Sequence, residues 1–327
     1  MTKLIIQIPC LNEAATLPAT LAELPRTIPG IDVIEYLVID DGSTDGTSDV
    51  ARAHGVHHVV RFKGHRGLAA AFTAGIDAAL RQGADYIVNT DADNQYPGRL
   101  IPELIAPLLS GKFDIVIGDR NIREIPHMSG LKKALQRIGS WAVRRVSNTA
   151  VPDTTSGFRG YTRDAALRMT VVSEFSYTLE TIIQAGKKRM AIAHVEIHTN
   201  AHTRPSRLFD SLYGYIKRSA ATIVRIYTMY EPLKVFSYIG GFLFLIGFAG
   251  LLRFVVSYLS QGGWEDGMIQ SLIMAATLMI VGMNIVLIGF VADAIASSRK
   301  LTEDVLYRMR KMELDNDRRD RRAGDRI

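Results

Sequence analysis

Residues 86–97 read YIVNTDADNQYP and place two acidic residues, Asp91 and Asp93, directly behind a short apolar run. The run 86–89 is rich in β-branched and aromatic residues, which is typical of a strand, and Pro97 marks the turn after it. Open α/β sheets bind their ligands at the carboxyl ends of their strands. This stretch therefore predicts both a strand and a ligand site.

The same organisation extends from residue 1 to about residue 200. Short β-branched runs alternate with stretches of helical apolar spacing, which predicts an α/β fold: a parallel sheet covered by helices on both faces. The predicted strands are 3–8, 34–39, 58–62, 86–89, 115–117 and 191–197, and the predicted helices are 14–24, 47–54, 68–82 and 100–109.

Polar residues also follow the first two predicted strands. Residues 9–13 read PCLNE, and residues 40–47 read DDGSTDGT. A turn with an Asp or Ser cap would explain the second segment by itself. It would not explain two consecutive carboxylates, Asp40 and Asp41, at a strand end. That position suits hydrogen bonds to a ribose or a base, so we expect a nucleotide there.

Asp91, Asp93 and Gln95 offer three oxygen ligands on one extended segment. Alternating carboxylates of this kind can hold a hard divalent cation, Mg²⁺ or Mn²⁺, against a diphosphate. Two Asp near a helix start are often only caps. The position after an apolar strand, in company with the Asp40–Asp41 pair, favours the metal site.

The chain has neither a P-loop nor a GxGxxG motif, so carboxylates, metal and basic side chains must hold a nucleotide. Each basic residue alone is more often a surface charge than a ligand. Arg120, after the fifth strand, and the Arg204/Arg207 pair are the best placed. The full set of candidates is Lys63, Arg66, Arg120, Arg159, Arg204 and Arg207. The single cysteine of the chain, Cys10, excludes an internal disulfide and favours a reducing, cytoplasmic compartment.

The C-terminal third contains two uncharged apolar stretches, 235–252 and 268–292. Each is long enough to cross a hydrocarbon core of ~30 Å as a helix. A pair of buried core helices is the alternative. Residues 206–230 interleave apolar and basic residues at helical spacing, which predicts amphipathic helices in the membrane interface or packed on the soluble domain.

These patterns divide the chain into six parts. We predict a catalytic domain at 1–205, interfacial helices at 206–232, spans at 233–259 and 268–293, an external loop at 260–267 and a charged, solvated tail at 294–327. The loop carries no Lys or Arg, whereas basic residues flank the other ends, so both termini are expected in the cytoplasm. Small residues in the first span, Gly240, Gly241, Gly247 and Gly250, permit close helix contacts and a homo-oligomer.

Taken together, the segments resemble a known family. They are IPCLNEAATL, VIDDGSTDGT, RGLAAAFTAGIDAA, DADNQYPGRL, IGDRN and DTTSGFRGYTRDA, followed by an interfacial helix and two spans. This combination resembles the family 2 glycosyltransferases of GT-A (Rossmann-like) fold. Within them it is similar to the polyprenyl-phosphate glycosyltransferases, such as dolichol-phosphate mannose synthase and the bacterial GtrB-type enzymes. The likeness covers essentially the whole chain.

The resemblance implies roles for individual residues. Nucleotide contacts are implied for Pro9, Leu11, Glu13 and Asp40, and metal and diphosphate contacts for the DAD segment with Gln95, including Ala92 between the two carboxylates. Asp153 matches an acidic residue near the reacting centre. The family often has a glycine and a serine–lysine pair where this chain has residues 204–207 (RPSR), so a phosphate-binding role transfers there only by charge and approximate place.

The resulting expectation is a membrane-bound, inverting hexosyltransferase of the bacterial inner membrane. It would move a sugar from a nucleotide-sugar, UDP favoured over GDP, to undecaprenyl phosphate, with Mg²⁺ or Mn²⁺ and without nucleic acid. The basic groups Arg204, Arg207 and Arg159 would position the acceptor phosphate, and Asp153 would orient it, take a residual proton or only cap a turn. The alternatives are a processive polysaccharide synthase, a non-catalytic scaffold and a lipid-linked nucleotidyltransferase.

Overall fold

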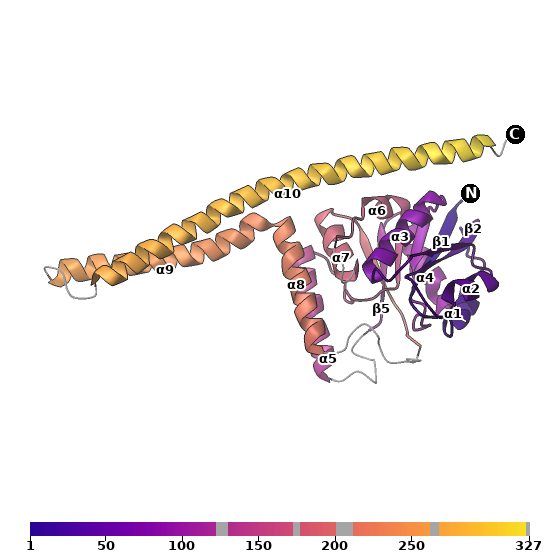
Figure 1. Cartoon of the computed structure of the whole chain (residues 1–327), viewed down its shortest axis with the longest axis horizontal. Coiled ribbons are helices and arrows are strands. Elements are labelled where there is room, and N and C mark those ends of the chain that lie inside the picture. The colour runs from indigo at the N-terminus through magenta and orange to yellow at the C-terminus, as the bar shows by residue number, and fades with distance from the viewer. Residues whose placement is uncertain (122–129, 173–176, 201–211, 262–267, 325–327) are drawn as a thin grey trace. The chain divides into compact units, whose positions relative to one another are not determined.

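The computed structural model of the chain describes residues 1–121, 130–172, 177–200, 212–261 and 268–324. They form two compact units. The first comprises Met1–Ile223 with Leu306–Ile327, and the second comprises Val224–Val305. Figure 1 labels the elements of both units.

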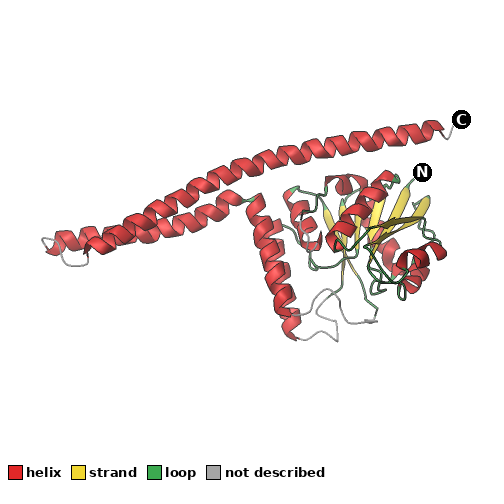
Figure 2. Cartoon of the chain, in the orientation of Figure 1, coloured by secondary structure: helices red, strands yellow, loops and turns green. Residues whose placement is uncertain are grey.

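The first unit contains a mixed sheet whose strand order, in the described residues, is β3-β2-β1-β4-β6-β5-β7. Helices cover both faces of it (Figure 2). Every neighbouring pair is parallel except the two pairs that β6 makes, with β4 and with β5. The strands are β1 (Lys3–Cys10), β2 (Val33–Asp40), β3 (His58–Arg61), β4 (Tyr86–Asn89), β5 (Ile115–Asp119), β6 (Arg159–Thr162) and β7 (Ile192–Glu196).

The sheet thus agrees with the predicted α/β class and differs from the predicted parallel sheet at one strand. β6 reads RGYT, which is too short and too polar to show an apolar period, so no pattern in the sequence predicts it. The helices of this unit are α1 (Leu17–Glu23), α2 (Thr47–Ala53), α3 (Leu68–Arg81), η1 (Gly98–Leu100), α4 (Ile101–Leu109), α5 (Gly130–Ser147), α6 (Arg163–Arg168) and α7 (Tyr177–Lys187).

Both faces of the central strands are buried, which explains their nearly continuous apolar sequences. Alternate residues of β1, such as Leu4 and Ile8, join one core cluster with residues of α1 and α4. Ile5 and Gln7, which point to the other face, are also fully buried. Burial of one such aliphatic side chain stabilises the fold by about 1.5–3 kcal/mol.

The register brings five chain segments to one edge of the sheet. Cys10 at the end of β1 pairs with Asp40 at the end of β2, and Asn89 at the end of β4 pairs with Arg159 at the start of β6. Because β5 is antiparallel to β6, its carboxyl end at Asp119 lies at the same edge. The loops after β1, β2, β4 and β5 and the loop before β6 therefore meet there.

The second unit contains α9 (Pro232–Gln261) and the first part of α10 (Met268–Gly324), preceded by the end of α8 (Leu212–Tyr230). We call α9 and residues 268–298 of α10 the hairpin. Both helices are long and apolar enough to cross a membrane, and only 11% and 17% of their most apolar windows are buried. A core helix of a soluble protein would be mostly buried, so these values indicate a membrane protein.

Glycines bring the two helices of the hairpin close together. A Cβ on Gly240 would lie 2.5 Å from the Gly282 carbonyl oxygen, and one on Gly247 would lie 2.6 Å from the Ala275 oxygen. Gly241 has no such neighbour within 4 Å. The predicted small-residue contact is therefore used within the hairpin at Gly240 and Gly247.

The helix α10 is longer than the predicted span and continues to Gly324, through residues predicted as a solvated tail. Leu314 lies in the segment predicted to be solvated, but it is only 5% exposed. Residues 206–211 of the predicted interfacial helices and residues 262–267 of the predicted external loop lie outside the described residues.

Candidate active site

The loops after β1 and β2 are joined by hydrogen bonds. The Asn12 amide donates to Ser43 Oγ at 2.9 Å, and Asn12 Oδ1 accepts from the Thr44 amide at 2.9 Å. Asn12 has a positive φ of 54°, a conformation that Asn adopts more easily than most residues. Pro9 is buried and Leu11 is half-buried beside this junction. The two loops form one surface.

The side chain of Glu13 also belongs to this junction. It is 7% exposed, and its Oε2 accepts a 2.7 Å hydrogen bond from Thr16 Oγ1. Its backbone amide donates to Thr47 Oγ1 at 3.0 Å. Glu13 therefore helps to fix the two loops, whatever it contacts in a ligand.

Asp40 is buried at the end of β2 and is held by its own loop. It accepts hydrogen bonds from the Ser43 amide at 2.7 Å and from the Ser48 hydroxyl. Burial raises the pKa of Asp40, but these hydrogen bonds and Arg61 outweigh it, and the net pKa is lower than usual. Asp40 is thus an ionised anchor of the loop.

Asp41 connects this loop to the start of α3. Its oxygens accept from the Arg66 amide at 2.7 Å and the Gly67 amide at 2.9 Å, and His65 lies 2.8 Å away. Gly42 has a φ of +79°, and a Cβ there would lie 2.6 Å from the backbone carbon of Gly64. Only glycine allows this approach. Asp41, like Asp40, therefore helps to hold the shape of this loop.

The DAD segment follows β4 and brings Asp91 and Asp93 together. The Gln95 side-chain amide donates to Asp93 Oδ2 at 2.7 Å, which ties two of the three predicted metal ligands together. Burial, together with the negative charge of Asp93, raises the pKa of Asp91 to about 7. The carbonyl oxygen of Ala92 accepts from Thr20 Oγ1 at 3.0 Å, which holds the segment against α1.

Gly157, in the loop before β6, faces Asp91. A Cβ on Gly157 would lie 3.1 and 3.2 Å from the two Asp91 oxygens. Asn89 fixes the distance between the two loops, because its Nδ2 donates to the Gly157 oxygen at 2.8 Å and to the Tyr177 hydroxyl at 2.9 Å. Gly157 also donates its amide to the Tyr96 hydroxyl at 3.2 Å. The absence of a side chain at Gly157 lets the Asp91 carboxylate lie against this loop.

These residues fit a divalent cation. In the described part of the chain no three His, Cys, Asp or Glu side chains gather as a metal site. Two adjacent carboxylates, one of them with a pKa near 7, nevertheless repel each other, and a cation between them would relieve this repulsion. Oxygen ligands are those that Mg²⁺ and Mn²⁺ prefer, with substrate phosphates completing the shell.

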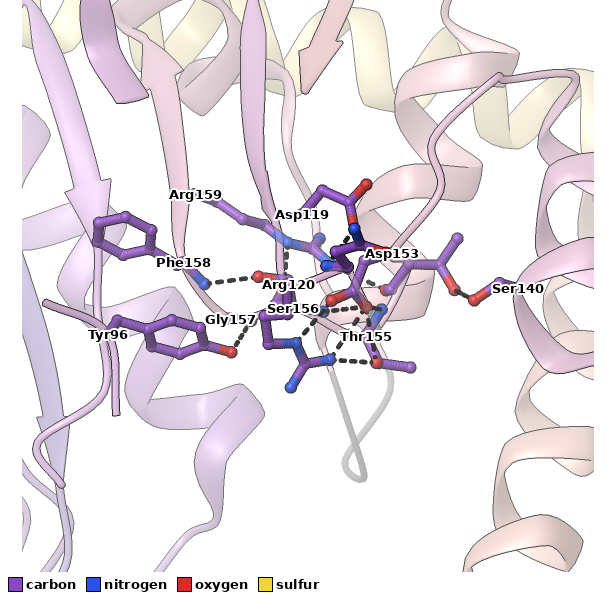
Figure 3. Close-up of polar contacts among 12 residues, drawn as sticks. Tyr96, Asp119, Arg120, Ser140, Asp153, Thr155, Ser156, Gly157, Phe158 and Arg159 are labelled. Carbon is purple, nitrogen blue, oxygen red and sulfur yellow. Dashed lines mark hydrogen bonds and ion pairs between the residues drawn. The ribbon is translucent and has the colours of Figure 1, made fainter. Parts of the chain in front are cut away.

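Arg120 and Asp153 form a bidentate ion pair at the same edge (Figure 3). Arg120 Nε donates to Asp153 Oδ2 at 2.6 Å and its Nη2 to Oδ1 at 3.0 Å. Asp153 also accepts from the backbone amides of Thr155 and Ser156, each at 3.1 Å. Burial raises the pKa of Asp153, but Arg120 and these donors lower it overall, below its usual value. An ionised, fully bonded carboxylate favours the turn-capping alternative over a proton acceptor.

Arg159 lies in the interior, although the sequence placed it among the phosphate-binding candidates. It is 1% exposed and donates to three carbonyl oxygens and one hydroxyl of its own domain: those of Ser156, Thr178, Thr154 and Thr181. Its guanidinium also lies over the Tyr177 ring (5.9 Å to the centroid). These contacts give Arg159 a structural role within the domain (Figure 3).

The structure thus brings the DAD segment, Arg120 and Asp153 to one edge. Arg204 and Arg207 lie outside the described residues. Sequence reasoning missed Asn89, Gly157, Tyr177 and Asn200, whose side chain donates to the Asn94 oxygen at 2.9 Å. Only Gly157 carried a signal, since it belongs to the DTTSGFR segment. The others have their roles through contacts with residues far away in the sequence.

Comparisons with known proteins identify the family and the fold of the chain. Residues 5–169 match the glycosyl transferase family 2 domain, and residues 231–298 match the GtrB C-terminal hairpin. The fold is similar to that of glucosyl-3-phosphoglycerate synthase from Mycobacterium tuberculosis, solved with Mn²⁺, UDP and glucosyl-3-phosphoglycerate. That likeness has a TM-score of 0.55 and 24% identity, and it covers 69% of this chain and 80% of that one. It confirms the predicted GT-A-like fold.

Two curated relatives act with a polyprenyl phosphate by name. The undecaprenyl-phosphate mannosyltransferase of Micrococcus luteus is 29% identical over 58% of this chain and 79% of its own length. The undecaprenyl-phosphate 4-deoxy-4-formamido-L-arabinose transferase of Pseudomonas paraeruginosa is 25% identical over 88% of this chain and 83% of its own length. The family match covers half of the chain, and the predicted resemblance is confirmed. The chain belongs to glycosyl transferase family 2 and is a glycosyltransferase.

Proposed function

We propose that this enzyme transfers a sugar from a nucleoside diphosphate sugar, UDP in preference to GDP, to undecaprenyl phosphate. The transfer would be one inverting displacement, with the phosphate oxygen of the lipid attacking the anomeric carbon and the nucleoside diphosphate leaving. The product would be a polyprenyl-phosphate sugar for modification of cell-envelope glycans or glycolipids. The relatives transfer different sugars, so the proposal names no sugar.

The observation that carries this proposal is the Asp91–Asp93 pair at the sheet edge, where Asp91 lies beside Gly157. Negative charge grows on the leaving diphosphate during the displacement, and groups that stabilise it lower the barrier. Bound Mg²⁺ or Mn²⁺ would supply that stabilisation as a Lewis acid. Asp91 and Asp93 would hold the cation, and the Gln95 side chain would fix the orientation of Asp93. Gly157 lets the Asp91 carboxylate keep this position, because a Cβ there would lie 3.1 and 3.2 Å from its two oxygens.

Arg120 supplies a positive charge beside the same edge. Asp153 and Thr155 hold its Nε and Nη2, so the guanidinium is fixed before substrate binds. Burial lowers the pKa of Arg120, but Tyr96, Asp153 and Asp91 outweigh it and raise the pKa overall, so Arg120 and Asp91 lie within electrostatic reach of each other. We assign Arg120 to the phosphates and Asp153 to the positioning of Arg120. The acceptor phosphate has a second pKa near 6 and is largely ionised at pH 7, so it needs little help from a base.

The acceptor is an apolar chain with a charged head, and an enzyme that uses it must work at a bilayer surface. The hairpin would anchor the domain in the bacterial plasma membrane, with the active site and both termini on the cytoplasmic side. Asn200 contacts Asn94, directly after the DAD segment, and stands four residues before Arg204 in the sequence. This favours Arg204 and Arg207 as the groups that position the acceptor phosphate. Gly241 on α9 leaves a small-residue position for contact with a second copy.

The test is a transfer assay with the purified protein in detergent, Mg²⁺, undecaprenyl phosphate and a panel of UDP- and GDP-sugars. Mass spectrometry of the lipid fraction should find undecaprenyl-phosphate sugar with one UDP-linked donor and none when EDTA is present. Transfer from a GDP-sugar alone would overturn the preference for UDP. Release of nucleoside diphosphate without a glycosylated lipid would overturn the acceptor.

The same assay separates the alternatives. A lipid that gains the mass of a nucleoside monophosphate would indicate a nucleotidyltransferase, and a ladder of sugar masses would indicate a processive synthase. NMR of the product determines the configuration at the anomeric carbon, and we expect it to be inverted relative to the donor. A retained configuration would contradict the single displacement.

A further inference from the structure

The C-terminal part of α10 contacts the catalytic domain. Residues 306–327 belong to the same compact unit as residues 1–223. The Tyr307 hydroxyl donates to Asp164 Oδ1 at 2.6 Å, and the Arg168 guanidinium lies over the Tyr307 ring, 4.6 Å from its centroid. Arg168 and Asp164 are themselves paired at 2.7 Å. The helix α6 therefore presents an acid–base pair that holds one tyrosine of α10.

A second set of contacts lies further along α10, against α3. Arg81 Nη1 donates to Glu313 Oε1 at 2.9 Å. Leu314, next in sequence, is 5% exposed and lines a small cavity together with Ile76 and Leu80 of α3. An apolar side chain buried beside an ion pair gives this contact both stabilisation and a defined register.

The contacting residues share one face of α10. Tyr307, Arg310 and Leu314 follow each other at spacings of three and four, which places them on one side of a helix. Met309 and Met312 lie on another side and are 59% and 62% exposed. Only one face of α10 thus contacts the domain. Leu314 on this face is buried, whereas Met309 and Met312 stay exposed.

The contacts of α10 also reach side chains that support the candidate active site. Phe72 of α3 lines the same cavity as Leu314, and its ring stacks on Tyr177 with 3.9 Å between centroids and 4° between planes. The Tyr177 hydroxyl accepts from Asn89, the residue that fixes Gly157 against Asp91. One continuous set of packed side chains therefore connects Leu314 to the site.

We propose that residues 307–314 are a docking segment that binds the α3–α6 face and ties α10 to the catalytic domain as a second connection besides α8. The helix α10 is continuous from Met268 to Gly324, so docking joins the apolar part of this helix to the domain. Because the segment is covalently attached, its high effective concentration lets individually weak contacts hold it. The segment acts as a positioning element for the domain, and it takes no part in the chemistry.

Hydrogen exchange of the full-length protein in lipid nanodiscs tests the docking directly. Leu314→Asp places a charge in the cavity, and the matched control Met312→Asp places the same charge on the exposed side. Leu314→Asp should speed exchange in residues 306–316 and in α3 by about tenfold or more, because docking protects both. Met312→Asp should leave both unchanged. Equal exchange in the two variants would overturn the docking segment.

Charge exchange gives a second test that does not depend on the cavity. Arg81→Glu and Glu313→Arg should each speed exchange in residues 306–316. The first leaves a new carboxylate facing Glu313 and Asp77, and the second leaves two guanidinium groups facing each other. The double variant R81E/E313R should restore the protection of the unmodified protein. Failure of the double variant to restore it would show that this pair does not hold the segment.

The positioning role has its own measurement and rests on the proposed function. In proteoliposomes, Leu314→Asp should lower transfer to undecaprenyl phosphate by about three- to tenfold, as misplaced groups do, and should leave the Kd for UDP unchanged. Unchanged transfer in a variant with a released segment would overturn the positioning role. If the unmodified protein transfers no sugar to this lipid, the proposed function fails, whereas the exchange experiment still decides the docking.

Discussion

The catalytic domain and the hairpin put large and small side chains in opposite places. In the domain, Leu4, Ile8 and Phe158 are fully buried. In the hairpin, Phe242 and Leu245 are each 65% exposed, and glycines occupy the helix contact instead. The same residue types thus have opposite environments in two parts of one chain.

The difference follows from the solvent of each part. In water, each Å² of apolar surface that is buried contributes about 25 cal/mol, so large side chains move inside. In lipid that gain is absent, and close backbone approach between helices stabilises their contact. Glycine consequently has two uses here. In the domain it makes room for other groups, as at Gly42 and Gly157, and in the hairpin it is the contact surface itself.

The largest expected effect concerns the candidate metal-binding carboxylates Asp91 and Asp93, which belong to the catalytic domain. Asp93→Asn removes one charge of the Asp91–Asp93 pair at nearly constant size. Sugar transfer should fall by at least about 10³-fold, because charge stabilisation at the leaving group is lost. Membrane association should not change, since the hairpin is untouched, and thermal stability should not fall, because the substitution removes the repulsion between Asp91 and Asp93. Steady-state assays across a Mg²⁺ and Mn²⁺ titration measure this effect.

Asp49→Asn is the matched control for this variant. Its side chain is 79% exposed on α2, far from the DAD segment in sequence, and the substitution should leave activity unchanged. Full activity of Asp93→Asn with Mn²⁺ would contradict the metal assignment.

Gly157→Ala tests the use of glycine to make room within the domain. The new Cβ would lie 3.1 Å from an Asp91 oxygen. We expect a loss of about 10- to 100-fold in activity, because small displacements of reacting groups are costly. Stability should change by about 1 kcal/mol or less. Gly139→Ala in α5, where a Cβ would meet no atom within 4 Å, is the control and should keep full activity. Equal activities would show that space at Gly157 is not needed.

Gly282→Ala tests the other use of glycine, in the hairpin. Its Cβ would lie 2.6 Å from the Gly240 oxygen and from the Phe244 nitrogen, both backbone atoms, so the helices must separate. We expect a loss of about 1–3 kcal/mol in unfolding free energy, as for overpacked cores. Unfolding in mixed micelles with increasing SDS measures it. Gly241→Ala has no neighbour within 4 Å and should stay within about 0.5 kcal/mol. Equal stabilities would mean that close approach does not hold the hairpin.

The sequence predicted the fold class and the place of the DAD segment because both depend on local patterns. Apolar periods locate β1, β2 and β4, and carboxylates that follow a strand locate a site. The antiparallel strand β6 has no such pattern. Its four residues become a strand only because β4 and β5 lie on either side of it.

The Arg120–Asp153 ion pair escaped sequence reasoning for the same reason. The sequence suggested separate roles, a phosphate ligand and an acidic group near the acceptor. Arg120 follows β5, and Asp153 stands in the loop before β6. The pairing of Ile117 with Arg159 brings these two segments together. Without β6 in the predicted sheet, nothing placed the two charges side by side.

The smallest expected effect concerns how acid acts on the two regions. The net pKa of Asp153 is depressed in the folded protein, so its contribution to stability is present above its unfolded pKa of about 3.9 and is lost as pH falls through the lower folded pKa. Glycine contacts in the hairpin do not titrate. Below about pH 4 the domain should therefore lose the Asp153 contribution, whereas the glycine contacts of the hairpin keep theirs.

Asp153→Asn isolates this contribution. The variant is less stable at pH 7, because Arg120 loses its counter-charge, but below about pH 4 its stability should fall less steeply than that of the unmodified protein. The variant takes up one proton fewer on unfolding, so the slope of its unfolding free energy with pH should differ by at most about 1.4 kcal/mol per pH unit. Denaturant midpoints from pH 7 to pH 3 measure the two slopes. Parallel slopes would show that Asp153 is not held ionised by Arg120, and acid would then no longer distinguish the domain from the hairpin through this pair.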